Sequence, residues 1–437
     1  MNRGMTRPTL PALSLVATIG AVGAFLAASQ GWRQGELWLI GAALGGTLWQ
    51  SSFSFAGAYR LALTERRTAG LRAQLLMIAM AACLFLPALD AGSVFGQPVR
   101  GFVFPIGMAL LVGAFLFGIG MQLGGGCGSG TLFAAGGGAA RSWLTLASFV
   151  VGATIAAWDG DRWLAWPALA PVSLPAWLGV WPSVAGSVAV LGAFVLLAGR
   201  VERGRHGEIQ ALSTRPASDT GAPTGVRFHL RPLAMGLRPW ATGLRPWAMG
   251  LRPLAMGLRP LAMGLWPLVM GLWPLATGAI VLAGLNFLTL IVAGRPWAIT
   301  AAFPLWGSKA IDATGFDDPT FWAFWDDPTR TEALLRPLLS DRTTIMDVGL
   351  VAGAGLAAIL SGRARPVWPN PRLRPALAAV LGGLLLGYGA VLATGCNISA
   401  FVGGIASGSL HGWVWIVPAL AGNFVGIRLR PWFRLAP

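Results

Sequence analysis

About ten apolar runs divide this 437-residue chain, and each is close to the length that a helix needs to cross a bilayer. A hydrocarbon core about 30 Å thick takes about 20 helical residues to span. In lipid the backbone must satisfy its own hydrogen bonds, and single runs of this length do so as helices. We therefore predict an all-α integral membrane protein. The runs lie at residues 10–30, 36–58, 71–90, 101–120, 143–158, 175–198, 277–293, 345–361, 376–393 and 411–427.

Charge supports the same class of protein. Only 11% of the residues are charged, whereas a soluble domain carries about 25%. The net charge of +16 comes from arginines in short clusters between apolar runs, which is the pattern that orients a membrane protein. No basic stripe with stacking aromatic residues occurs in a polar segment, so we expect no nucleic-acid partner. The expected surroundings are the lipid bilayer of a bacterial inner membrane, crossed several times.

The basic clusters also predict which loops face the cytoplasm. They lie at 60–72, 200–227, 363–374 and 428–434. Residues 311–341 instead hold seven acidic side chains and fit the outer side. If both termini are cytoplasmic, every basic cluster falls on the cytoplasmic side and the acidic segment falls on the outer side.

One glycine-rich motif occurs twice, and each copy holds one of the three cysteines. The first copy ends at Cys127 and the second at Cys396, 269 residues later. A duplicated motif that keeps its rarest residue indicates two halves meeting at a shared site, as in many membrane transporters. The matched positions are Gly113, Leu116, Gly118, Gly120, Leu123, Gly126 and Cys127 with Gly382, Leu385, Gly387, Gly389, Leu392, Gly395 and Cys396.

The predicted loop orientation makes the two copies inverted, because the span before Cys127 runs inward and the span before Cys396 runs outward. We therefore predict an inverted-repeat helical bundle in which some segments are short or re-entrant half-helices, with a pseudo-two-fold axis near the midplane. The expected divisions are a peripheral N-terminal helix (1–35), a first transport repeat (36–160), a peripheral helix (161–199), a cytoplasmic linker (200–276) and a second transport repeat (277–437).

A seven-residue repeat that begins Arg-Pro-Leu-Ala-Met-Gly-Leu spans residues 231–279. Proline in every unit removes a helical hydrogen bond, so the repeat is not a heptad coiled coil. The near-identity of the units indicates recent tandem duplication. A tolerated insertion and an element that binds a partner or the membrane surface both stay open.

The cysteine motifs are the candidate site. Ten glycines between Gly118 and Gly138 disfavour a lipid-facing helix, since each costs about 1 kcal/mol relative to alanine. Irregular backbone at membrane depth belongs inside the protein or beside a water-filled path. Glycine lets peptide N–H groups approach an anion, a half-helix adds its positive end, and cysteine adds a soft S–H donor. The predicted path residues are Gly126, Cys127, Gly128, Gly395, Cys396 and Asn397.

Other glycines and the third cysteine receive a structural interpretation. Glycines in membrane helices mark close helix crossings, and we assign Gly113, Gly118 and Gly120 to packing. Cys83 has no counterpart in the repeat. We predict that it is a small buried hydrophobic residue.

Four stretches of the sequence resemble the YeeE/YedE family of sulfur-transport membrane proteins. Two are the cysteine motifs, Gly-Gly-Gly-Cys127-Gly-Ser-Gly and Ala-Thr-Gly-Cys396-Asn-Ile-Ser, the second continuing to His411. The others are residues 41–60, around Gln50-Ser-Ser-Phe-Ser54-Phe, and residues 294–307, around Ala-Ile-Thr300. The resemblance covers most of the chain outside 200–276.

The resemblance implies an inverted-repeat bundle with re-entrant half-helices that takes up thiosulfate or a similar small anion. The anion would pass along Cys127 and Cys396 by S–H hydrogen bonds without covalent turnover, so no enzyme activity, cofactor or metal is expected. A cytoplasmic sulfur-carrier protein is the implied recipient. The family usually has a cysteine where this chain has Ser54, so Ser54 is a secondary site residue. Thr300 and His411 lie in the other resembling stretches and are secondary site residues as well.

Three alternatives stay open. A membrane thiol–disulfide oxidoreductase would use Cys127 and Cys396 as a redox pair, although the chain has no Cys-x-x-Cys motif. The path could carry another sulfur or selenium compound, or the chain could be an accessory subunit without a path. Uptake that requires both cysteines would indicate transport, whereas a dithiol–disulfide change would indicate redox chemistry.

Overall fold

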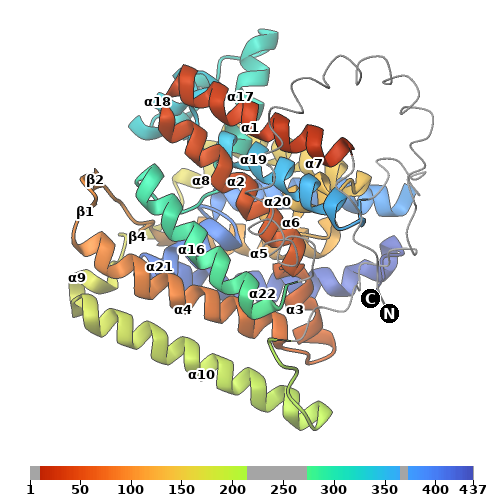
Figure 1. The fold of residues 1–437 in the computed structure, drawn as a ribbon. Helices are drawn as coiled ribbons and strands as arrows, with labels where there is room; N and C mark the ends of the chain where they lie inside the picture. Colours follow the sequence, from red (N-terminus) through yellow and green to blue (C-terminus); the bar gives the residue numbers. More distant parts are fainter. Residues whose placement is uncertain (1–9, 214–272, 365–372, 437) are drawn as a thin grey trace, which may run out of the picture.

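The computed structural model describes residues 10–213, 273–364 and 373–436, and these residues are mostly helical (Figure 1). Most of the heptapeptide repeat lies outside them. The longer helices are α1 (Leu10–Gln30), α2 (Trp32–Ser51), α4 (Ala69–Asp90), α5 (Met108–Gly124), α7 (Ala140–Trp158), α10 (Val180–His206), α16 (Leu275–Ala293), α17 (Ala302–Thr314), α19 (Arg342–Leu360), α20 (Leu373–Leu392) and α22 (Leu410–Leu429).

Shorter elements connect these helices. They are α3 (Phe55–Thr64), α6 (Gly128–Gly136), α8 (Gly160–Leu164), α9 (Leu174–Leu178), α18 (Pro328–Leu335), α21 (Gly404–Ala406), the π-helical turn η4 (Asn397–Gly403), and the 3₁₀ turns η1 (Pro319–Phe321), η2 (Ala323–Trp325), η3 (Leu338–Ser340) and η5 (Arg430–Phe433). Two antiparallel strand pairs join β1 (Ser93–Val94) to β2 (Gln97–Pro98) and β3 (Ile106–Gly107) to β4 (Ala168–Leu169).

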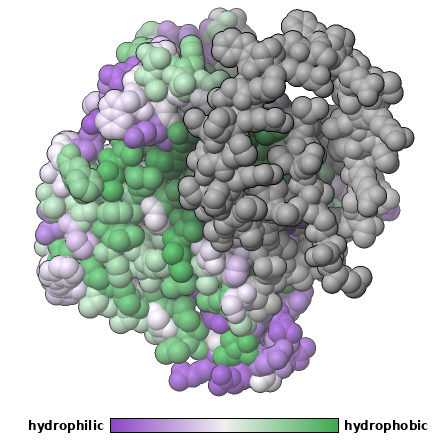
Figure 2. Space-filling model, in the orientation of Figure 1, coloured by the Kyte–Doolittle hydropathy of each residue, from purple (hydrophilic) through white to green (hydrophobic). Residues whose placement is uncertain are grey.

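The structure confirms an all-α membrane protein. Nine helices in the described residues are long and apolar enough to cross a membrane, and α2 adds a tenth helix of 20 residues. Figure 2 shows apolar residues across the middle of one face, with hydrophilic residues at its upper and lower edges. One predicted run, 36–58, is divided, because Ser52 adopts a left-handed conformation (φ 49°) that ends α2 before α3 begins.

The two repeats are inverted, as the sequence predicts. Equivalent helices α5 and α20 run antiparallel: Gly113 lies against Gly389 and Ala393, whereas Gly120, two turns later, lies against Gly382. A second equivalent pair, α2 and α16, also runs antiparallel, since the end of α2 at Ser51 meets the start of α16 at Gly278. Antiparallel equivalents place the pseudo-two-fold axis across the helices, near the membrane plane.

The helix contacts follow the same symmetry. The equivalent helices are α2 and α16, α4 and α19, α5 and α20, and α7 and α22. Under this exchange the α2–α19 contact corresponds to α16–α4, and the α5–α22 contact corresponds to α20–α7. All four contacts are present. The half-helices obey the exchange too, because α6 packs on α19 while α21 packs on α4. Gly118 sits at one of these crossings, where its Cα faces the backbone of Ala419. The glycines assigned to packing therefore lie at helix crossings.

Two helices lie outside the symmetric bundle (Figure 1). α1 packs on α2 and α19, and α10 packs on α4. α10 is held by a buried ion pair, in which Arg72 Nη2 lies 3.0 Å from the carboxylate of Glu202. The helix continues to His206 and ends at Gly207 (φ 76°), so the first residues of the predicted linker are helical.

Candidate functional site

Both motif cysteines are the residues at which half-helices begin. Cys127 is the N-cap of α6, and Cys396 is the N-cap of η4, which continues into α21. Both side chains are fully buried. The positive ends of the half-helices are therefore located at the cysteines.

Three chain segments converge at Gly128. A methyl group at this position would lie 3.4 Å from Cys396 Sγ, and 3.3 Å from side-chain carbons of both Ile299 and Thr300. The start of α6, the start of η4 and the 294–301 loop before α17 thus meet at one point. The structure brings together Cys127, Gly128, Cys396 and Thr300 from segments far apart in the sequence.

Each cysteine has a serine beside its sulfur. Cys127 Sγ lies 3.3 Å from Ser129 Oγ. Ser399 Oγ accepts a hydrogen bond from the Cys396 peptide N–H (3.1 Å) and lies 3.9 Å from Cys396 Sγ. These hydroxyl groups add polar atoms beside the two thiols. Neither serine is among the residues predicted from the sequence, although Cys-x-Ser and Cys-x-x-Ser spacing at a helix start is present in it.

A fourth segment joins the site through Asn397. Its Nδ2 donates to the hydroxyl of Tyr59 on α3 (3.0 Å), and both residues are buried. The Asn397 Oδ1 has no hydrogen-bond partner among the described residues. α3 is the half-helix that precedes the first cysteine motif, so both halves of the molecule contribute to the site.

The backbone before Cys396 approaches its neighbours closely. Thr394 and Gly395 have φ values of 57° and 145°. A side chain on Gly395 would overlap Ser399 Oγ, so only glycine fits here. Gly126 is similarly tight, since a methyl group there would lie 3.0 Å from the backbone of Gly130 and Thr131.

A cavity of about 420 Å³, here called the vestibule, leads to Gly395 and Ser399. It lies on the face that carries the acidic 311–341 segment. Its polar or charged lining residues include Arg295, Thr300, Asp327, Thr329, Arg330, Thr394 and Ser399. The vestibule therefore connects one surface of the molecule with the start of the half-helix η4.

The vestibule is cationic. Burial lowers the pKa of Arg295 and Arg330, but a guanidinium keeps its proton in proteins. Arg295 donates to Thr343 Oγ1 (2.9 Å), and Arg330 lies over the Phe324 ring at 4.4 Å. The Asp327 carboxylate caps α18, and its hydrogen bond from the Thr329 hydroxyl holds its pKa below the usual range. Neither arginine belongs to the ion pairs found in the described residues.

The secondary site residues lie in different places. Thr300 lines the vestibule and contacts the Gly128 position. Ser54 caps α3, with its Oγ accepting from the Gly57 N–H at 3.1 Å. His411 is buried at the start of α22, where Nδ1 lies 2.7 Å from Ser409 Oγ. Only Thr300 adjoins both the vestibule and the cysteines.

The prediction for Cys83 was wrong, because this side chain is exposed. It lies beside Leu84, which is also exposed, on a part of α4 that no other helix of the described residues covers. A cysteine on this surface faces lipid and not the protein core.

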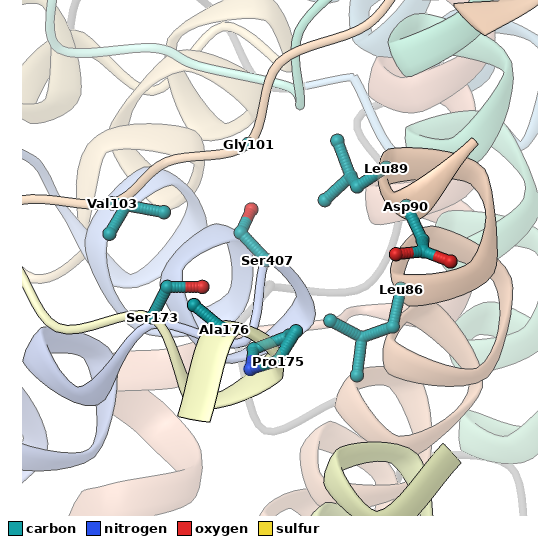
Figure 3. A pocket seen from close by; sticks show the side chains of 9 residues that line it. All are labelled: Leu86, Leu89, Asp90, Gly101, Val103, Ser173, Pro175, Ala176 and Ser407. Carbon is teal, nitrogen blue, oxygen red and sulfur yellow. The ribbon is translucent and has the colours of Figure 1, made fainter. Parts of the chain in front are cut away.

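A second cavity, of about 330 Å³, lies beside Ser407 at the end of the half-helix α21 (Figure 3). Ser407, after α21, faces Leu86 and Leu89 of α4 across it, and Pro175 of α9 closes one side. None of the predicted path residues lines this cavity. Within the described residues no group of three or more His, Cys, Asp or Glu side chains is placed to hold a metal ion.

Comparison with known proteins identifies the family of this chain. Residues 50–425 match the family described as Sulphur transport. The chain is 31% identical over 160 residues to the probable transporter YedE of Escherichia coli K12 and to that of Salmonella typhimurium LT2. It is 40% identical over 78 residues to the thiosulfate transporter TsuA of Spirochaeta thermophila.

These pairwise matches are partial. The YedE match covers 36% of this chain and 38% of each YedE protein, and the TsuA match covers 18% of this chain and 23% of TsuA. The family match is much longer and includes both cysteine motifs and the 294–307 stretch. The chain belongs to the sulphur transport family of membrane proteins.

Proposed function

We propose that this protein is a permease for a small sulfur-containing anion, and that thiosulfate is its substrate. The observation that carries the proposal is the meeting of two half-helix starts, each with a buried cysteine, beside Gly128. Helix N-termini favour anions, and thiols are soft donors suited to a sulfur atom. The name of the relative TsuA supports thiosulfate as the first substrate to test.

The proposed route begins in the vestibule, where Arg295 and Arg330 attract the anion. It continues past Gly395 to Cys396 and then to Cys127, each thiol donating a hydrogen bond to the terminal sulfur. A thiol is a weak donor, so the anion can leave one cysteine for the next. No bond to sulfur is made or broken, and the protein acts as a carrier without enzymatic turnover.

We place the vestibule on the outer face of a bacterial inner membrane, with both termini in the cytoplasm. The basic clusters near Arg60 and Arg72 support this orientation. A cytoplasmic sulfur-carrier protein would then collect the anion on the inner side. Thiosulfate carries two negative charges, and an inside-negative potential opposes uptake by about 2.3 kcal/mol per charge per 100 mV. Uptake therefore needs a driving force.

The direct test is uptake of ³⁵S-thiosulfate by cells that lack their own systems and express this chain. Cys127→Ala and Cys396→Ala each remove one sulfur donor, so we expect each to reduce uptake to the background rate. Cys83→Ala is the matched control, because Cys83 faces lipid, and it should transport like the wild type. Membrane levels are measured in parallel.

The outcomes separate the competing functions. Full uptake by both alanine variants contradicts the relay. Uptake of selenite or sulfite in place of thiosulfate would keep the permease and change its substrate. A thiol titration that shows Cys127 and Cys396 cycling to a disulfide, without uptake, would instead establish the oxidoreductase.

A further inference from the structure

One buried acid has no role in the proposed relay. Asp347 lies in the membrane-spanning helix α19 and is fully buried. Neither of its carboxyl oxygens has a hydrogen-bond partner among the described residues. An ionised carboxylate without a partner is very unfavourable in such a place, and ionisable residues inside membrane helices mark ion or proton pathways.

The neighbours of Asp347 along the helix show which way it faces. One turn before it, Thr343 accepts a hydrogen bond from Arg295 (2.9 Å) and Thr344 accepts one from Trp306 Nε1 (2.9 Å). One turn after it, Val351 contacts Gly136 of α6. Residues three and four apart share a helix face. Asp347 therefore faces the 294–306 segment and α6.

Those two elements are walls of the substrate site. The 294–301 loop and the start of α6 meet at Gly128, next to Cys396. The loop also carries Trp297, whose buried indole Nε1 has no acceptor among the described residues. An acid without a donor and a donor without an acceptor thus lie on α19 and on the loop that Arg295 joins to it.

Few charged groups surround this acid. Asp341 and Arg342 lie at the start of α19, Arg295 lies on the facing loop, and Arg33 and Glu36 lie near the start of α2. α17, whose Trp306 bonds to Thr344, carries Lys309, which donates to the Leu334 carbonyl, and the exposed Asp312. The remaining packed elements, α6, α1 and η3, carry no titratable side chain in the described residues. Asp347 is therefore the acid placed to change its protonation at the site.

We propose that Asp347 binds and releases a proton in each transport cycle, so that uptake of the anion is coupled to proton influx. This rests on the permease proposed above. The carboxyl group takes a proton from the outer solution, keeps it while the anion occupies the site, and releases it to the cytoplasm. Only its O–H bond is broken and remade. One proton carried with each dianion halves the negative charge moved against the membrane potential.

The test uses the purified full-length protein in liposomes that contain the pH dye pyranine. Thiosulfate added outside should acidify the lumen in the wild type. An inward gradient of one pH unit should raise accumulated ³⁵S-thiosulfate about tenfold, since one unit is a tenfold ratio of protons. Asp347→Asn, which cannot carry a proton, should lose the acidification and the gradient-driven accumulation. It should keep exchange of labelled for unlabelled thiosulfate.

Asp312→Asn is the matched control, because Asp312 is exposed at the end of α17, and it should behave as the wild type. Gradient-driven accumulation by Asp347→Asn would overturn the proposal, and so would thiosulfate exchange by the wild type without acidification. The second result does not depend on folding of the variant. Absence of exchange in the wild type would instead contradict the permease itself.

Discussion

At the scale of the residue, Cys127 and Cys396 are equivalent in position but not in surroundings. Cys396 adjoins the vestibule through Gly395 and Ser399, whereas Cys127 is held beside Ser129. The flanking residues differ as well, with Gly128 after one cysteine and Asn397 after the other. The charge near the two cysteines also differs, because Arg295 lines the vestibule that adjoins Cys396. In the proposed route the two thiols therefore serve different steps, capture at Cys396 and release at Cys127.

Arg295 carries a prediction at this scale. Arg295→Gln removes a partly desolvated cation, and charged hydrogen bonds of this kind contribute about 1.5–3 kcal/mol. We expect the apparent KM for thiosulfate to rise roughly tenfold to a hundredfold, with a much smaller change in maximal rate. Arg295→Lys should recover part of the loss. Arg336→Gln is the control, since Arg336 is exposed and paired with Glu332. An unchanged KM in Arg295→Gln would exclude the arginine from substrate capture.

At the scale of the element, four half-helices define the site: α3, α6, α17 and η4 with α21. α6 and η4 begin at the cysteines, and α17 begins directly after the 294–301 loop. α3 contributes Tyr59 to Asn397. None of these elements is long enough to cross a membrane alone. The fold brings the first residues of these short helices together at the site.

Gly128 tests this arrangement. In Gly128→Ala the new methyl group meets Cys396 Sγ at 3.4 Å and the Ile299 and Thr300 side chains at 3.3 Å. Neighbours must shift by a few tenths of an ångström, so the protein should fold while the constriction narrows. We expect uptake to fall on the order of tenfold with little change in thermal stability. Gly186→Ala, in open space on α10, is the control. Normal uptake by Gly128→Ala would remove Gly128 from the path.

The sequence predicted where the helices lie better than which side of each helix faces the lipid or the protein interior. Apolar length identified the spans, the offset between Cys127 and Cys396 identified the repeat, and the basic and acidic loops identified its inversion, because all three are properties of the linear pattern. The lipid-facing position of Cys83 and the burial of Asp347 depend on how α4 and α19 are rotated. Rotation follows from packing against distant helices, which a single sequence does not display. The contact of Tyr59 with Asn397 was hidden for the same reason.

At the scale of the whole molecule, the antiparallel pairs α2–α16 and α5–α20 make the two repeats a single body. α5 and α20 approach through glycines, at Gly113 with Gly389 and at Gly120 with Gly382. α19 and α22, which both belong to the second repeat, pack on α2 and α5 of the first repeat. Neither repeat has its own complete core, so we expect neither to fold alone.

Orientation is the prediction at this scale. Single cysteines at Asp312→Cys and Glu65→Cys, in a chain carrying Cys83→Ala, Cys127→Ala and Cys396→Ala, are treated with an impermeant maleimide on intact cells. Both positions are exposed. Asp312→Cys should be labelled, and Glu65→Cys only after the cells are permeabilised. The reverse pattern would place the vestibule in the cytoplasm.

The antiparallel crossing of α5 and α20 has a consequence for the direction of flow. A half-turn about their axis exchanges the two membrane faces and carries each cysteine approximately onto the other. With this symmetry, the proposed route is equivalent when it is followed from either side of the membrane. If the proposals above hold, the direction of transport follows from the features that differ between the two sides: the arginines of the vestibule, the acid Asp347 on α19, and the consumption of the anion inside the cell. Reversing the external gradients should make the same protein export its substrate.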